Sequence, residues 1–493
     1  MSVLPDAVRR FLDKAPDSLL LQADSPEPAA GRHDRVAVAV RDRLALRAFG
    51  VPEGVKARVV AVFVEYAAGP VTVVPRPEWP ALSRIRARAA AGGWMTVLHF
   101  ARRVDVADLL AELGRQAVHR GSGDLWSVSG SATDHRSPLP GSLDQRVLNP
   151  IGFDTAPTAP TAPVVDAATL DLRDGATEQL VADLRPAAGV RVETWDDATF
   201  RAVAGLAMAG VPVTAATAPA EQLGAEVAAA ITAPVELDDV LAREEHSLVL
   251  RRAALDAFSR PSRTPAVSIV LATRRPDMLD FAVGQVARQR GVDALELVLA
   301  PHGFEVDEAR VLDLLGPDTA LQVCPQPETV IFGDVLAAAA RAAEGDVILK
   351  MDDDDWYAPD AIADLLRARS YSGAELVGMP PEFHYLVERD LTVRRGHPSE
   401  HYATFVAGGT MMVDRAMLRE VGGFRSVRKY VDAQLLAAVR AAGGAIYRTH
   451  GLGYLLRRTP SGHTWQVDLD YLLDPERVAA TYDGLRPSRV MEI

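Results

Sequence analysis

The sequence predicts an α/β protein whose C-terminal part is built on a mostly parallel, Rossmann-like sheet. Two kinds of observation lead to this prediction. Apolar stretches, Val267–Ala272 and Leu295–Ala300, alternate with helical patterns, which is typical of parallel strands buried under helices on both faces. A third apolar stretch, Val347–Met351, ends abruptly in four consecutive aspartates. Ligands of open α/β sheets bind at the carboxyl ends of the strands, so this acidic run marks the candidate site.

The N-terminal region, residues 1–153, is also expected to be α/β. Runs of β-branched residues predict strands, and apolar residues three to four positions apart predict helices. We expect strands at Val36–Val40, Arg58–Glu65 and Trp94–Phe100, and helices at Trp79–Ala91 and Val104–Arg115.

Composition predicts the boundaries of the later parts. Residues 154–164 are a Pro/Thr/Ala-rich linker or loop without apolar periodicity. Residues 165–233 form a second α/β segment, which could belong to one domain with 1–153. Residues 234–264 predict a connecting helix, with leucines seven residues apart and charges expected on a solvated face. Residues 265–493 are then the domain of the parallel sheet.

The overall composition limits the class of protein. The chain has 493 residues, which predicts two or three domains, and a net charge of −13, which argues against a general nucleic-acid-binding protein. The single cysteine, Cys324, cannot form an intrachain disulfide. No uncharged apolar stretch reaches the ~18 residues of a transmembrane helix, and residues 1–15 lack a signal core. We expect a cytoplasmic bacterial protein, with peripheral membrane association left open.

The acidic run Asp352–Asp355 is the strongest candidate for a binding site. Two like charges ~4 Å apart repel by roughly 4 kcal/mol at an effective dielectric constant near 20, and a hard divalent cation would offset that repulsion. A calcium-binding EF-hand would need a glycine where this chain has Tyr357. A solvated acidic turn before a helix starting near Pro359 stays open, but the apolar strand that precedes the run favours metal binding.

Several motifs, taken in their order and spacing, resemble a known family. They are the stretches 267–279, 296–299 and 345–360, together with Gln289. They resemble the nucleotide-sugar-binding half of family 2 glycosyltransferases of GT-A fold. The resemblance covers about residues 265–465. It departs from the family at 300–303, where acidic residues are usual.

The acceptor half of that family is also represented. The stretches 408–415 and 421–425 resemble its acceptor-side segment. Where the family has a catalytic pair of acidic residues, this chain has Val431 and Asp432. Only Asp432 therefore matches a catalytic residue of the family. This resemblance implies that Asp432 is the general base, which takes the proton of the acceptor during transfer with inversion. The alternative role of Asp432 is that of a helix N-cap.

The resemblance further implies a metal-dependent hexosyltransferase that uses a nucleotide-diphosphate sugar. Asp352 and Asp354 would form its DXD motif and hold Mn²⁺ or Mg²⁺ against the donor diphosphate. His463 would be a further metal ligand, and His450 is the weaker candidate for that role. The other candidate donor-binding residues are Thr273, Arg274, Arg275, His302, Asp353, Asp355, Arg457 and Arg458. The candidate acceptor-binding residues are Gly408, Gly409, Thr410, Glu382 and Trp465.

Some of these residues also have a simpler structural explanation, and the function has alternatives. Residues 273–275 could be a surface turn, and residues 457–465 a polar loop. A retaining transferase, or a degenerate transferase that serves as a sugar-binding or scaffold protein, is the alternative function. The acceptor is a glycan, a lipid-linked glycan, a protein or a small molecule. The N-terminal region resembles only faintly half of a GT-B glycosyltransferase; without a glycine-rich phosphate loop, it is expected to bind the acceptor, form a homo-oligomer or dock a partner.

Overall fold

The computed structural model describes two long stretches of the chain, residues 4–118 and 160–493, with gaps inside each. The gaps are 23–29, 42–44, 47–48, 52–53, 66–70, 72–78, 81, 91–92, 174, 177, 259–264, 373, 443 and 460–468. The predicted linker at 154–164 therefore falls mostly outside the described residues. No helix among those described combines the length and apolar character that a membrane crossing needs.

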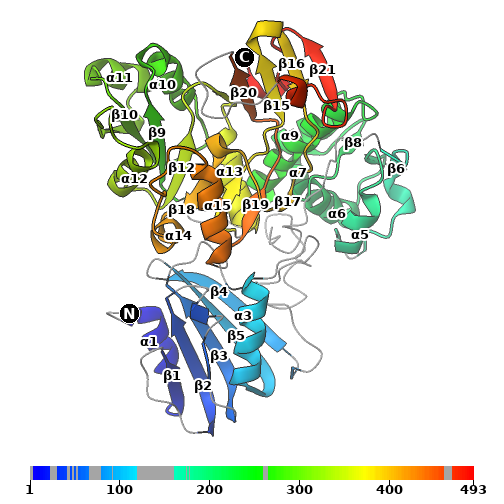
Figure 1. Ribbon diagram of the computed structural model, residues 1–493. Helices are drawn as coiled ribbons and strands as arrows, with labels where there is room; N and C mark the ends of the chain where they lie inside the picture. Colours follow the sequence, from blue (N-terminus) through cyan, green and yellow to red (C-terminus); the bar gives the residue numbers. More distant parts are fainter. Residues whose placement is uncertain are drawn as a thin grey trace.

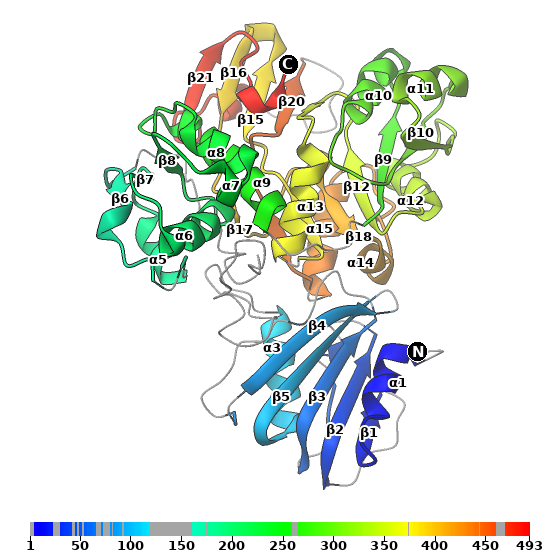
Figure 2. The same cartoon turned by 180° about the vertical axis from the view of Figure 1, so that it is seen from behind.

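The N-terminal stretch folds into a five-stranded sheet with a helix on each face (Figures 1 and 2). In spatial order the strands are β1 (Ser18–Leu21), β2 (Gly31–Val40), β3 (Val55–Val64), β5 (Gly93–Asp105) and β4 (Leu82–Ala90). Because side chains alternate along a strand, Val36 and Val38 pack with α3 (Val106–Val118), whereas Ala37 and Ala39 pack with α1 (Asp6–Leu12). Each face of this sheet thus has its own small core.

The predicted helix at Trp79–Ala91 is wrong, because most of that stretch is strand β4. Arg84, Arg86 and Arg88 are exposed and alternate with buried Ile85, which is the two-residue period of a strand. β4 pairs antiparallel with β5 at the edge of the sheet. The alanines of this stretch favoured a helix locally, but pairing with β5 overrides that preference. The other four expected N-terminal elements are present as β2, β3, β5 and α3.

Residues 160–258 form a small parallel sheet surrounded by helices. The sheet consists of β6 (Val165–Asp166), β7 (Val190–Val192) and β8 (Val213–Ala215). The helices are α5 (Glu178–Leu184), α6 (Asp197–Met208), α7 (Ala220–Leu223), α8 (Ala225–Thr232) and α9 (Val240–Phe258). Asp196 caps α6, because its carboxylate accepts a hydrogen bond from the Thr199 amide at 2.8 Å.

The C-terminal part is organised around an eight-stranded mixed sheet. Its order is β11 (Thr319–Val323), β10 (Leu295–Pro301), β9 (Val267–Thr273), β12 (Val347–Met351), β18 (Met412–Asp414), β14 (Leu376–Gly378), β19 (Ile446–Arg448) and β17 (His401–Tyr402). The first four strands are parallel. β18 is antiparallel to both of its neighbours. The predicted α/β class is confirmed, with three strands of the parallel half where the sequence placed them.

Helices and a second sheet complete this part. The helices are α10 (Leu279–Ala287), α11 (Glu308–Leu315), α12 (Phe332–Ala342), α13 (Ala361–Ser372), α14 (Arg415–Glu420), α15 (Val431–Ala441) and α16 (Leu469–Leu472). The second sheet has the order β13 (Trp356–Tyr357), β20 (Tyr454–Arg458), β15 (Phe383–Leu386), β16 (Leu391–Arg394) and β21 (Ala480–Asp483). β13 follows the acidic run directly, so the run connects the two sheets.

Helix α9 joins residues 160–258 to the C-terminal part. One continuous hydrophobic core runs from Ala167 through α9 to Met491, separate from the two cores of the N-terminal sheet. The expectation of a solvated charged face on this helix is wrong, because Glu244 and Arg251 are buried. Arg251 pairs with Glu400 at 2.7 Å, and Glu244 pairs with Arg394. The partners lie far away in sequence, so their pairing could not be read from the helix alone.

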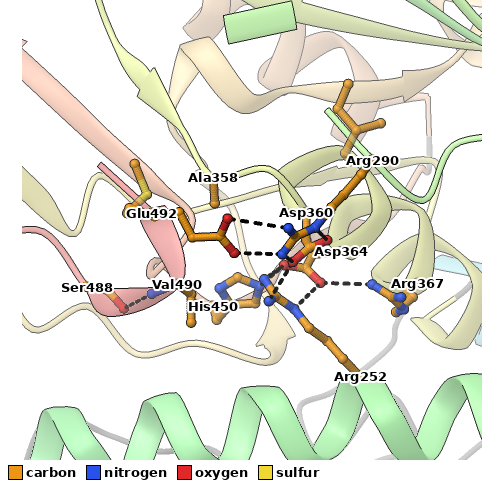
Figure 3. A network of polar contacts seen from close by, with 12 residues as sticks. Arg252, Arg290, Ala358, Asp360, Asp364, Arg367, His450, Ser488, Val490 and Glu492 are labelled. Atoms are coloured by element: carbon orange, nitrogen blue, oxygen red, sulfur yellow. Dashed lines mark hydrogen bonds and ion pairs between the residues drawn. The ribbon is translucent and has the colours of Figure 1, made fainter. Parts of the chain in front are cut away.

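Figure 3 shows a second polar network at the same helix. Arg252 of α9 donates from Nε to Asp364 of α13 at 2.9 Å, and its Nη1 lies 3.0 Å from Asp360. His450 Nε2 lies 3.0 Å from Asp364, and Arg290 bonds both Asp360 and Glu492. Burial alone raises the pKa of Asp364, but Arg252 and His450 outweigh it and hold that pKa below its usual value. His450 therefore belongs to this network.

Candidate active site

Strand β12 brings the acidic run to the centre of the large sheet. All five of its residues are buried between β9 and β18. The run Asp352–Asp355 begins where β12 ends. Because β9, β10 and β12 run parallel, Thr273–Arg275 and His302, which end β9 and follow β10, lie at the same edge of the sheet. The edge where the sequence predicted a donor site therefore gathers both groups.

A buried lysine links the acidic run to Asp432. The Lys350 side chain is 3% exposed, and its Nζ lies 2.7 Å from Asp352 Oδ1 and 3.4 Å from Asp432 Oδ1. Burial lowers the pKa of Lys350, but the two carboxylates outweigh this effect and raise its pKa overall. Lys350 therefore stays protonated, and one ammonium group serves two carboxylates that remain partly open to solvent, at 34% and 38% exposure.

The Asp432 carboxylate lies against the η6 turn (Gly408–Thr410). Asp432 is the second residue of α15, and a Cβ built on Gly408 would be 2.0 Å from Asp432 Oδ2. Glycine at this position thus provides the space that the carboxylate occupies. Burial raises the pKa of Asp432, Lys350 lowers it, and Asp352 raises it further. The alternative N-cap role is not filled, because the N-cap of α15 is Tyr430 and no side chain caps the helix.

Two buried tyrosines hold the η6 turn at the end of β12. The Tyr357 hydroxyl donates to Gly409 O and accepts from the Asp352 amide, each at 2.9 Å. A Cβ on Gly409 would lie 2.5 Å from Tyr454 Oη and 2.9 Å from Asp352 Oδ2. Thr410 is buried and its Oγ1 accepts from the Met379 amide at 2.9 Å. The structure therefore brings the predicted acceptor-side glycines next to both Asp352 and Asp432.

The middle of the acidic run is bound by the turn after β9. Arg275 contacts both carboxylate oxygens of Asp353, and its Nη1 donates to Asp354 Oδ2 at 2.9 Å. The Thr273 hydroxyl donates to Asp353 Oδ2. Asp353 and Asp354 are nearly buried, so Arg275 supplies part of the positive charge that the sequence argument assigned to a metal ion alone.

Asp355, the last aspartate of the run, faces the second sheet. It accepts a hydrogen bond from the Tyr454 hydroxyl and one from the Arg457 amide at 2.9 Å. Burial, followed by the charges of Asp354 and Asp352, raises the pKa of Asp355 to about 8. Asp355 is therefore ionised less readily than an ordinary aspartate.

Arg274 and His302 lie together at the ends of β9 and β10. Arg274 Nε donates to His302 Nδ1 at 2.9 Å, and its Nη2 donates to Glu328 O at 2.7 Å. Burial, with Arg274 as the second cause, lowers the pKa of His302. The imidazole is thus held neutral as an acceptor for Arg274, which directly precedes Arg275 in the chain.

Two other predicted groups have different surroundings. Glu382 is 2% exposed, and its carboxylate accepts from Arg394 Nε at 2.9 Å, the His397 amide at 2.7 Å and the Gly396 amide at 3.1 Å. The structure therefore does not join Glu382 to the acidic run. The Arg457 guanidinium lies 5.5 Å from the centre of the Trp356 ring, and Arg458 ends the same strand. His463 and Trp465 lie outside the described residues.

Sequence reasoning missed Lys350, Tyr357 and Tyr454 as parts of the site. Lys350 had a usable signal, because a lysine inside a short apolar strand needs a buried partner. The tyrosines had none, because Tyr357 donates to Gly409 and Tyr454 donates to Asp355, which lie 52 and 99 positions away in sequence.

The residues at the end of β12 fit a divalent cation. Carboxylate oxygens are the ligands that Mn²⁺ and Mg²⁺ prefer, and Asp352 is the most exposed aspartate of the run. After burial, the charges of Asp354 and Asp352 contribute to the raised pKa of Asp355, and such a cation would offset those charges. Within the described residues, no cluster of three or more His, Cys, Asp or Glu side chains is positioned as a complete ligand set. Further ligands would come from the substrate or from His463, which lies outside the described residues.

Known proteins share features with this chain. Residues 305–436 match the family model described as Glycosyl transferase family 2. Among solved structures, mannosyltransferase PcManGT from Pyrobaculum calidifontis, in complex with GDP-Man and Mn²⁺, is 16% identical with a TM-score of 0.33, over 41% of this chain and 59% of that one. S. aureus TarS 1–349, in complex with UDP-GlcNAc, is 13% identical with a TM-score of 0.34, over 42% and 63%. A search of curated proteins gave no match.

These similarities concern a limited part of each molecule. The chain spans about three-fifths of the length of both solved structures. The family match includes β12, the η6 turn and Asp432. It confirms that the C-terminal part of this chain is similar to family 2 glycosyltransferases.

Proposed function

We propose that this chain transfers a sugar from a nucleotide-diphosphate donor to an acceptor hydroxyl, with a divalent cation and with inversion. The observation that carries the proposal is the pair of contacts at Lys350. One ammonium group touches Asp352 at the end of β12 and Asp432 at the start of α15, and both carboxylates border the η6 turn. In this proposal the donor side and the acceptor side lie next to each other at Lys350.

On the donor side, Asp352 and Asp354 would hold the cation. A cation in this position neutralises the negative charge that develops on the nucleoside diphosphate as the glycosidic bond breaks. Arg275 keeps Asp353 and Asp354 in place, and Tyr357 orients the backbone of Asp352. The Arg457 guanidinium, beside Trp356, adds positive charge on the same side.

On the acceptor side, Asp432 would take the proton of the attacking hydroxyl. Lys350 favours the ionised form of Asp432, and Gly408, which has no Cβ, leaves room for the carboxylate. With a single carboxylate acting as base and no covalent intermediate, the attacking oxygen enters opposite the leaving group, which inverts the anomeric centre. NMR of the anomeric configuration of the product distinguishes inversion from retention.

Donor binding should stabilise the protein. A thermal-shift screen of UDP-, GDP- and dTDP-sugars, with and without Mn²⁺, is expected to show one donor class that raises the midpoint only when Mn²⁺ is present. A donor concentration a hundredfold above Kd corresponds to about 2.7 kcal/mol of added stability.

Asp354→Ala should abolish turnover, because it removes a proposed ligand of the cation. Asp280→Ala, which removes an exposed aspartate paired with Arg310, should not. Unchanged turnover in Asp354→Ala would reject the metal role.

Gly408→Ala tests the acceptor side without removing a charged group. The new methyl group would lie 2.0 Å from Asp432 Oδ2 and must displace the carboxylate from Lys350. We expect kcat to fall by at least about tenfold, because misplacement of a base by ~1 Å can cost a hundredfold. Gly284→Ala in α10 is the control, since its added methyl group meets nothing within 4 Å. Equal rates for the two variants would contradict the placement of Asp432.

A further inference from the structure

The loop between α14 and α15 is fixed by contacts at several positions and presents exposed side chains between them. Phe424 and Val431 are buried on either side of residues 425–430. The Gly333 amide of α12 donates to Val427 O at 3.1 Å, and the Ser426 hydroxyl donates to Asp334 at 2.8 Å. The loop is therefore a defined surface that leads directly into Asp432.

The exposed side chains of this loop are strongly basic. Arg425, Arg428 and Lys429 are all exposed, although the whole chain carries a net charge of −13. Within the part of the chain that the structure describes, their side chains make no hydrogen bond or ion pair, whereas many other arginines are paired with carboxylates. Three unpaired cations beside the proposed base favour a ligand with negative charge.

A strained tyrosine follows these cations. Tyr430 has a φ of +63° and is 73% exposed, so a bulky side chain is held in the left-handed region without any packing to compensate for it. Such conformations cluster at functional sites. Among the described residues, the exposed aromatic side chains are Phe405, Tyr430 and Tyr471. Phe405 lies three positions before Gly408, and Tyr430 lies two positions before Asp432. Gly408 and Asp432 contact each other.

We propose that Phe405, Tyr430 and the cations of this loop form an acceptor subsite for a sugar that carries a phosphate or carboxylate group. The aromatic faces would stack on the apolar face of the sugar ring, and the guanidinium and ammonium groups would bind its anionic substituent. This inference rests on the proposed function, because it assigns the chemical class of the acceptor.

The test measures binding of three polysaccharides to the full chain: neutral dextran, polygalacturonate, which carries carboxylates, and phosphomannan, which carries phosphates. The loop variant combines Arg425→Gln, Arg428→Gln and Lys429→Gln. The control variant removes the same charge from the N-terminal sheet through Arg58→Gln, Arg84→Gln and Arg86→Gln, all of them exposed positions. Preference for polygalacturonate or for phosphomannan distinguishes the two sources of negative charge.

We expect the wild-type chain to bind at least one anionic polymer about tenfold or more tighter than dextran, and the loop variant, unlike the control, to lose that preference. Tyr430→Gly should weaken binding while leaving the unfolding midpoint unchanged or higher, since glycine relieves the strained φ; Tyr430→Phe should retain binding. Equal losses in both triple variants, or no preference over dextran, would overturn the inference.

Failure of the inference can be told apart from failure of the proposed function. Hydrolysis of nucleotide sugars with Mn²⁺ is measured on the wild-type chain alone. If hydrolysis is present but the loop and control variants bind alike, only the acceptor assignment is wrong. If no nucleotide sugar is hydrolysed or transferred, the proposed function itself is wrong.

Discussion

Asp432→Asn is expected to lower kcat for sugar transfer by about 10²–10⁴-fold, the range over which a positioned general base contributes to catalysis. Asparagine has nearly the same shape as aspartate, so the contact with Gly408 is preserved, but the amide cannot take a proton. Donor binding should persist, because Asp352 and Asp354 are unchanged. The measurement is steady-state transfer kinetics together with the thermal shift produced by the donor and Mn²⁺.

The control for this variant is Asp280→Asn, which changes an exposed aspartate paired with Arg310 at the surface. It should transfer sugar at the wild-type rate. A kcat within a few fold of wild type for Asp432→Asn, with the donor still bound, would remove Asp432 from the role of base and favour a retaining mechanism. Loss of donor binding together with kcat would instead indicate that Asp432 belongs to the donor side.

A chain shortened to residues 265–493 should fail to fold, whereas residues 160–493 should fold and unfold cooperatively. The shorter chain loses α9 and leaves Glu400, Arg394 and Asp364 buried without their partners on that helix. Glu400 would lose its arginine, and a buried charge without its partner costs about 3–5 kcal/mol, against a total stability of roughly 5–15 kcal/mol for a typical domain. Arg394 and Asp364 would keep Glu382 and His450 but would each lose an ion pair to α9. Circular dichroism and urea unfolding of the two chains provide the comparison.

Single substitutions in the full chain test the same explanation. Arg251→Met removes a buried partner of Glu400, and about 3–5 kcal/mol of stability should be lost. Arg173→Met breaks an exposed pair with Asp171 and should change the unfolding midpoint little. If residues 265–493 unfold as cooperatively as residues 160–493, then α9 is dispensable and the continuous core is not a single folding unit.

Local sequence patterns predicted the parallel half of the large sheet well. β9, β10 and β12 are short, apolar and bounded by polar turns, and burial on both faces leaves that signature in the sequence itself. The acidic run was predictable for the same reason, because it interrupts an apolar strand. Only the order of motifs in the resembled family suggested that Asp432 and Gly408 belong to one site. Nothing in the sequence near either residue shows that they are in contact.

What could not be predicted depends on partners distant in sequence. Arg251 and Glu244 look like ordinary surface residues of an amphipathic helix until Glu400 and Arg394 are placed against them. β4 was missed because its alanines favour a helix, while its pairing with β5 follows only from the tertiary fold. Lys350 was visible as an unusual residue in an apolar strand. Of its two partners, Asp352 directly follows that strand, but Asp432 lies in a helix about eighty positions later.

Helix α9 has a consequence for how this protein could be recombined with others. Five of its charged side chains pair with residues of the C-terminal part: Glu244, Glu245, Arg251, Arg252 and Asp256. His246 and Arg251 also bond Val213 O and Met208 O within residues 160–258. A transplanted catalytic half would therefore have to include everything from residue 160 onward. The five-stranded N-terminal sheet, with its own cores, is the portion that a chimera could exchange for another module.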